Sequence, residues 1–314
     1  MSEVLDSYLD ESRYRQGDGG GRLVLETAAG LTPLGLIANP VFFSGTLAYP
    51  EVAAAGLRSL VEIASTRYFN PIPGGFASLD PVVTAQGDRL RCEAFSACNG
   101  VYARLDLLSD SFDSASLGVG TTNIDINPPL AFALASIRGQ DRLHLNVGPE
   151  QIVFATPAGA RTEHKVKLPE RWVRGFGETQ SLASILEPRA RLDAMSWRRF
   201  INALPMTGGS GAGVKLWLHP VGAALRQTSR AQPGVISLAG SARLSAIKRM
   251  QYLVRAVNIY SPPVDAGTQA AISATAATPY PAAPNPMPLA RSIHGALVGI
   301  VSVRSSESGR VGGW

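Results

Sequence analysis

Apolar side chains recur at helical spacing in several stretches of the chain, and these stretches predict helices. The clearest is Pro50–Tyr68, which has a proline at its start, where the missing N–H costs nothing. In Met195–Leu204, the aromatic and aliphatic residues fall on one face and Arg198 and Arg199 on the other. The same reasoning predicts further helices over residues 127–137, 169–186 and 241–254.

Two apolar runs of strand length predict a β-hairpin in the first half of the chain. Leu90–Ala97 and Val101–Leu107 flank Asn99-Gly100, a pair that supplies the positive φ angles of a type I′ turn. Alternation also predicts a strand over Gly118–Ile126 and a meander over 142–168. Shorter strands are expected at 214–218, 235–238 and 257–260. These elements together predict an α+β fold, in which mixed antiparallel sheets carry flanking helices.

Charge divides the chain into two unequal parts. Residues 1–137 hold 15 Asp and Glu against 8 Lys and Arg, whereas residues 138–264 hold 7 against 18. We therefore predict an acidic N-terminal unit over 1–137, in which residues 1–22 form a polar arm, and a basic unit over 138–265. Residues 266–290 carry no charge and are rich in Ala, Thr and Pro. We expect the low-complexity segment 266–314 to be a largely disordered tail, because such a composition buries too little surface to offset its ordering entropy.

The basic unit contains the candidate binding residues. No acidic side chain lies between Asp193 and Asp265, which predicts that the 194–264 segment presents a cationic face to an anionic partner. Clustered lysines and arginines on helix faces are what phosphate contacts require. The candidate nucleic-acid-binding residues are Arg198, Arg199, Arg230, Lys248 and Arg249.

No catalytic or metal-binding signature stands out. The glycine-rich loop Gly208–Lys215 lacks the Gly-Lys-Ser/Thr succession of a phosphate-binding loop. Cys92 and Cys98 fit no common zinc spacing, and the four histidines do not pair at ligand spacing. We expect Asp106 and its acidic neighbours to form a solvent-exposed edge of the fold. We therefore predict no catalytic residue, no metal ligand and no cofactor.

Several strings occurring in one order carry a resemblance to a known family. They are Asn39–Gly45, Ala77–Val83, Gly87–Asp106, Gly120–Pro129, Leu168–Glu178 and Arg226–Leu238. Together they resemble the N-terminal region of bacterial, especially actinobacterial, SWIM zinc-finger proteins. The SWIM element itself, C-x-C followed by C-x-H, is absent from this sequence, so the family's zinc site has no counterpart here. The departure begins near Asp265, and a shifted reading frame or a truncation would account for it.

The resemblance implies binding to DNA or proteins rather than chemistry. It implies a protein partner, for which a MoxR-type ATPase or a von Willebrand factor A protein is a candidate. The leading hypothesis is a non-enzymatic interaction or adaptor module. The alternatives are a nucleic-acid-binding protein that uses the basic segment, and an enzyme of unrecognised type. The acidic N-terminus has no signal-peptide core and the longest apolar run is too short to span a bilayer, so a cytoplasmic protein is expected.

Overall fold

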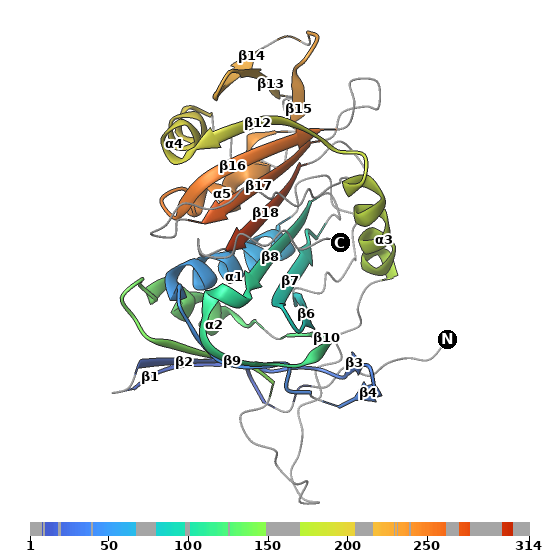
Figure 1. Ribbon diagram of the computed structural model, residues 1–314, viewed down its shortest axis with the longest axis vertical. Coiled ribbons are helices and arrows are strands. Elements are labelled where there is room, and N and C mark those ends of the chain that lie inside the picture. The colour runs from blue at the N-terminus through green and yellow to red at the C-terminus, as the bar shows by residue number, and fades with distance from the viewer. Residues whose placement is uncertain are drawn as a thin grey trace, which may run out of the picture.

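Two sheets and a small third one organise the protein (Figure 1). The structure, a computed structural model, describes most of the chain. The described residues are 8, 10–17, 20–38, 40–66, 80–97, 101–124, 126–148, 170–204, 216–228, 230, 232–238, 240–261, 270–276 and 297–303. Helices pack against strands of mixed direction, which confirms the α+β class.

The first sheet has five strands in the order β1-β2-β11-β5-β9. They are β1 (Arg13–Gly17), β2 (Gly20–Leu25), β11 (Leu143–Val147), β5 (Phe43–Leu47) and β9 (Phe112–Leu117). The hairpin of β1 and β2 replaces part of the polar arm expected over residues 1–22, because the consecutive apolar side chains Leu23, Val24 and Leu25 of β2 are buried. Strand β11 pairs with both β2 and β5, so the change of charge near residue 138 does not coincide with the edge of a sheet.

The second sheet has ten strands in the order β12-β16-β17-β18-β8-β7-β6-β10-β3-β4. Its N-terminal strands are β3 (Gly30–Thr32), β4 (Gly35–Ile37), β6 (Val82–Gln86), β7 (Arg89–Phe95), β8 (Tyr102–Leu108) and β10 (Val119–Asn123). The others are β12 (Glu187–Asp193), β16 (Val254–Ser261), β17 (Ala270–Ala276) and β18 (Leu297–Val303). Most pairs are antiparallel, but β18 runs parallel to both β17 and β8.

The predicted hairpin of two apolar strands is confirmed. Strands β7 and β8 pair from Arg89↔Leu108 to Phe95↔Tyr102. The Ser96 N–H then donates to the Val101 carbonyl at 2.8 Å, and the Val101 N–H donates to Ser96 Oγ at 2.9 Å. The predicted turn residues Asn99 and Gly100 lie outside the described residues.

Two segments within the tail predicted over 266–314 form strands. Strand β17 pairs with β16, and β18 bridges β17 to β8. The run Leu297–Val303 is rich in β-branched residues and finds a ready partner in the neighbouring strands. These two strands connect the strands of the N-terminal half to β12 and β16. The rest of the tail lies outside the described residues.

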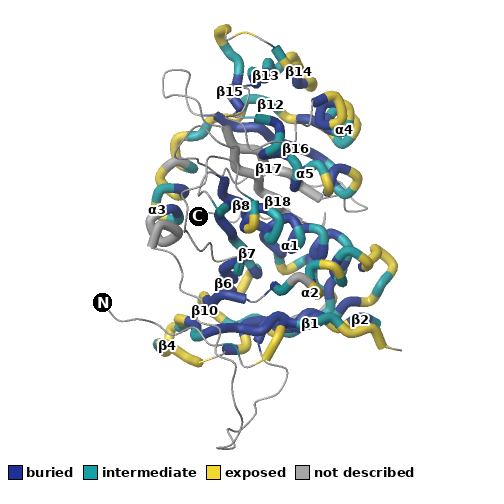
Figure 2. The backbone as a smooth tube through the Cα atoms, turned by 180° about the vertical axis from the view of Figure 1, so that it is seen from behind, coloured by how far each residue is buried: buried dark blue, intermediate teal, exposed yellow. Residues whose placement is uncertain are grey.

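Helix α1 (Pro50–Ser65) forms the centre of the packing. It covers β7 and β8, where a Cβ added at Gly56 would lie 2.8 Å from the Leu105 methyl carbons, so the helix approaches the sheet closely. Ser59 Oγ donates to the Ala246 carbonyl at 3.3 Å, linking α1 to α5 (Ser245–Arg249). Figure 2 shows buried residues running through α1 and the strands beside it.

The remaining helices lie near the positions predicted for them. They are α2 (Pro128–Ala133), α3 (Glu170–Ala183) and α4 (Ala194–Ala203). The helix expected over 241–254 is shorter than predicted, because a 3-10 turn precedes α5 and β16 already begins at Val254. The third sheet has the order β14-β13-β15, with β13 (Leu216–Val221), β14 (Ala224–Thr228) and β15 (Ile236–Leu238). The expected meander beyond β11 and the loop over 207–213 lie outside the described residues.

Candidate binding surfaces

The hairpin of β3 and β4 carries exposed apolar side chains on both of its faces. Leu34, at the turn, is 91% exposed, and Leu31 and Leu36 are 65% and 62% exposed. Leu31 and Leu36 lie opposite one another in the ladder and so share a face, while Ile37 is on the other. Isolated exposed leucines are ordinary, but a contiguous group of them indicates an interaction surface.

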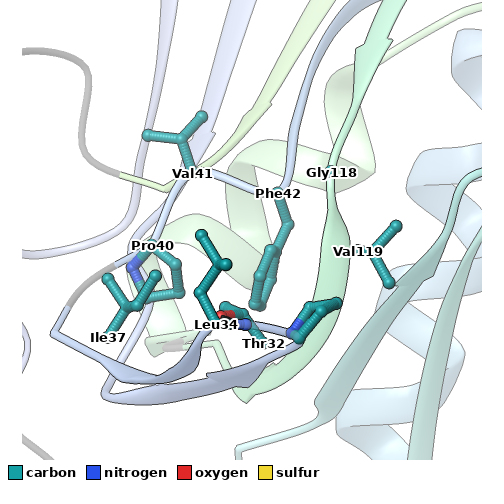
Figure 3. A pocket seen from close by; sticks show the side chains of 9 residues that line it. Thr32, Leu34, Ile37, Pro40, Val41, Phe42, Gly118 and Val119 are labelled. Carbon is teal, nitrogen blue, oxygen red and sulfur yellow. Dashed lines mark hydrogen bonds between the residues drawn. The ribbon is translucent and has the colours of Figure 1, made fainter.

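An open groove of about 390 Å³ lies against this hairpin (Figure 3). It is lined by Thr32, Pro33, Leu34, Ile37, Pro40, Val41, Phe42, Gly118 and Val119. The Phe42 ring is almost fully buried and forms the floor, while Val41 and Val119 are half exposed at the rim. Every lining residue is uncharged, so the groove suits an apolar group and offers no acid, base or nucleophile beyond the Thr32 hydroxyl.

Local backbone geometry fixes the hairpin over this groove. Gly35 has a φ of +104°, which glycine adopts without strain, and Thr32 Oγ1 donates to its carbonyl at 2.9 Å. The hairpin is held to the sheet at Leu31↔Thr121. Beside that contact, Gly120 has a φ of +155°, and an added Cβ would lie 2.6 Å from both the Leu31 carbonyl oxygen and the Phe42 ring. A side chain at position 120 would therefore displace both the hairpin and the floor.

Two further features define what this surface can bind. No charged residue occurs from Thr27 to Pro50, so the region around the groove is electrically neutral. Within the described part of the chain, β4 is also the last strand of its sheet. An edge strand presents unpaired backbone N–H and C=O groups that an extended segment of another chain can pair with.

The basic residues singled out from the sequence lie in several different environments. The guanidinium of Arg198 lies 5.6 Å from the Tyr252 ring centre, a cation–π contact. Arg249 forms an ion pair with Glu62 on α1. Arg199 and Arg230 are exposed, and Lys248 is half buried. Of these five, only Arg199 lines one of the grooves described here.

A second groove, of about 370 Å³, lies between α4 and β14. Helix α4 supplies Ser196, Arg199, Phe200 and Ala203, Leu204 follows at its end, and β14 supplies Ala224, Leu225, Arg226 and Gln227. Phe200, Leu204 and Leu225 are largely buried and form the floor, whereas Arg199 on α4 and Arg226 on β14 are exposed. Sequence reasoning identified Arg199 but not Arg226, whose position on β14 becomes meaningful only when the strand packs beside α4.

A ladder of buried charges crosses β7 and β8. Arg91 Nε donates to Asp106 Oδ1 at 2.9 Å, and Arg104 Nη2 lies 2.7 Å from Asp106 Oδ2, an ion pair without hydrogen-bond alignment. The Asp106 carboxylate is 3% exposed, so the expectation of a solvated acidic edge is wrong for this residue. Glu93 lies opposite Arg104 and accepts from the Tyr102 hydroxyl. Burial raises the pKa of Glu93, and burial also raises the pKa of the Cys92 thiol on the other face of β7.

One polar cluster has some of the components of a catalytic site. On the first sheet, Ser44 Oγ lies 3.1 Å from His144 Nε2 and donates to Asn146 Oδ1 at 2.8 Å. Asn146 also contacts Nε2 of the same ring, at 3.2 Å. A catalytic triad instead needs the third residue at Nδ1, with the serine proton directed at the imidazole. The arrangement therefore fits a hydrogen-bonded strand pair better than a nucleophile.

The described residues also bear on metal binding and on membrane spanning. Among the described residues, no three His, Cys, Asp or Glu side chains gather as a metal site would require, and the residues present do not fit the SWIM zinc site. His164 and Cys98 lie outside the described residues. No helix in the described ranges combines the length and hydropathy needed to cross a membrane.

Comparison with known proteins gives little to set beside these observations. No family model matches the chain, and no curated protein matches it. Among solved structures, one similar chain belongs to the crystal structure of a PCNA2–PCNA3 complex from Sulfolobus tokodaii. The identity is 7%, the TM-score is 0.42, and the match covers 73% of this chain and 92% of that one. No function is carried over to this chain from that complex.

Proposed function

We propose that this protein is a non-enzymatic protein-binding module whose β3–β4 groove holds an uncharged, apolar segment of a partner in extended conformation. The observation that carries the proposal is the exposed group Leu31, Leu34, Leu36 and Ile37 beside a groove with no charged lining residue. The resemblance to SWIM-family proteins points the same way. Within that resemblance, a MoxR-type ATPase or a von Willebrand factor A protein is the proposed partner.

The geometry favours a strand-like partner over a small ligand. The groove is open and shallow, whereas small-molecule sites enclose most of the ligand surface and add a few convergent polar groups. An extended segment added at β4 would pair with the free backbone of the edge and place alternate side chains over Phe42. Main-chain hydrogen bonds would supply affinity and the apolar groove would supply specificity.

Leu34→Asp tests this proposal. Because Leu34 is 91% exposed, the change should alter the free energy of unfolding by no more than about 0.5 kcal/mol. If a partner buries Leu34, its loss should weaken binding by about 1.5–3 kcal/mol, or roughly 10- to 150-fold in Kd. Phe132→Asp is the matched control, since Phe132 is 83% exposed on α2 and outside the groove.

The assay compares proteins captured from the native host by the full chain and by each variant. Mass spectrometry identifies any protein that Leu34→Asp loses and Phe132→Asp retains, and calorimetry with that purified protein measures the change in Kd. Burial of apolar surface also predicts a negative heat-capacity change. The proposal fails if no captured protein distinguishes the two variants.

Nucleic-acid binding is the second candidate function. It is favoured by the exposed Tyr252 ring beside Arg198, because an aromatic ring next to a guanidinium suits a stacked base, and by the absence of acidic residues between Asp193 and Asp265. Its test is the joint change of Arg198, Arg199, Lys248 and Arg249 to Ser. The change should abolish binding to a labelled oligonucleotide, and wild-type affinity should fall steeply with salt. Binding that survives the change would exclude these residues.

A further inference from the structure

We propose that the groove between α4 and β14 is a second docking site, for an acidic peptide segment that inserts an apolar side chain between two carboxylates. Figure 1 shows β13 and β14 at one end of the molecule and β3 and β4 at the other, so this surface is distinct from the apolar groove above. The inference goes beyond the proposed function and does not depend on it.

The shape of the groove suits an amphipathic segment. Its floor is formed by Phe200, Leu204 and Leu225, each no more than 6% exposed, so these side chains are packed in place before any partner arrives. Asp193 caps α4 by accepting from the Ser196 N–H at 2.7 Å, which fixes the wall that carries Arg199. The other wall is fixed by pairing of β14 with β13, where Arg226 lies opposite His219.

The positive charge of the groove favours an anionic partner. Arg199 and Arg226 form no ion pair with any described residue, and Asp193 is the last acidic residue before Asp265. Two guanidiniums across one groove repel each other until an anion lies between them. Each presents a planar set of donors that matches a carboxylate in two-point geometry.

The floor argues for a peptide rather than a nucleic acid. Single strands bind on aromatic rings whose faces are open for stacking. Among the described residues, Phe200 is the one aromatic side chain that lines this groove, and it is 6% exposed. An aliphatic side chain flanked by aspartate or glutamate matches both the apolar floor and the cationic walls.

A displayed peptide library panned on the full chain tests the inference. The expected result is enrichment of peptides in which Asp or Glu flanks Leu, Ile or Val. Arg226→Glu and Arg199→Glu should each weaken a selected peptide by about tenfold or more, because each removes a charge-assisted contact. Arg230→Glu is the matched control, since Arg230 is exposed nearby but does not line the groove.

Each outcome of this experiment decides the question. The inference is supported if affinity for the selected peptide falls in Arg199→Glu and Arg226→Glu and is retained in Arg230→Glu and Leu34→Asp. Retention by Leu34→Asp also separates this site from the first groove. Equal losses in all three arginine variants would show only a general charge effect and would overturn it. No acidic enrichment, or displacement of the selected peptide by a labelled single-stranded oligonucleotide at lower concentration, would also overturn it. Thermal unfolding of each variant confirms that the fold is retained.

Discussion

Asp106→Asn should be among the most destabilising polar substitutions in this protein. The carboxylate is 3% exposed and faces Arg91 and Arg104, which are 16% and 5% exposed. Removing its charge leaves two shielded guanidiniums without their shared counter-ion. Breaking a buried ion pair in this way costs about 3–5 kcal/mol, a large part of the roughly 5–15 kcal/mol by which proteins are usually stable.

Asp88→Asn is the matched control for this measurement. Asp88 also pairs with an arginine, Arg89, at 2.6 Å, but its side chain is 59% exposed. Solvent screens such pairs, so the change should cost no more than about 1 kcal/mol. Urea unfolding followed by tryptophan fluorescence measures both variants. If Asp106→Asn costs as little as Asp88→Asn, the ladder across β7 and β8 does not hold the sheet as described.

Buried residues of β7 and the glycine beside the first groove give three more tests. Burial raises the pKa of Glu93 above its ordinary value near 4.5, so the stabilisation that protonated Glu93 provides is present below that pH and is lost as the pH rises. Glu93→Gln should therefore become more stable relative to wild type from about pH 4.5 upward, as measured by urea titrations. In a Cys98→Ser background, the fully buried Cys92 should react with a thiol reagent only at the rate of unfolding, and fast labelling of the native protein would contradict its placement. Gly120→Ala should lower stability by about 1–3 kcal/mol and weaken partner binding, measured by urea unfolding and calorimetry, because the left-handed backbone and the Leu31 carbonyl leave no room for a methyl group.

Local signals were sufficient to predict several elements of the fold. Proline at the first position and regular apolar spacing predict α1, and the apolar face of α4 follows from the same periodicity. The hairpin of β7 and β8 is predicted from its two apolar runs. Its register places Arg91 opposite Asp106 and Glu93 opposite Arg104. Counting outward from a two-residue turn at Asn99-Gly100 would instead place Glu93 opposite Asp106, so the Arg91–Asp106 pair could not be predicted from the sequence.

Long-range pairing could not be predicted in the same way. Composition alone argued for a disordered tail, yet β17 and β18 have neighbouring strands to pair with on both sides. Strand β11 joins β2 and β5 although both partners lie far away in the sequence, and no local pattern specifies them. Charge patterning describes solubility and attraction, and it places no boundary in the hydrogen-bonded sheets.

The apolar groove shows a second limit of sequence reasoning. The run from Thr27 to Pro50 has no charge, which is consistent with a buried segment as well as with an exposed one. Only the fold shows that Leu34 lies exposed at a hairpin turn, while Phe42, eight positions later, is buried. The same holds for Arg226, because its role depends on the helix that packs across the groove from it.

Site-specific photo-crosslinking tests directly whether a partner protein docks in the β3–β4 groove. A photoreactive residue is placed at position 34 of the full chain in its native host, and at position 132 as the exposed apolar control. If the β3–β4 groove docks a partner, a discrete crosslinked protein is expected at position 34, absent at position 132 and absent when Gly120→Ala displaces the hairpin. Crosslinking at position 132 alone, or identical products at both positions, would contradict a docking role for the β3–β4 groove.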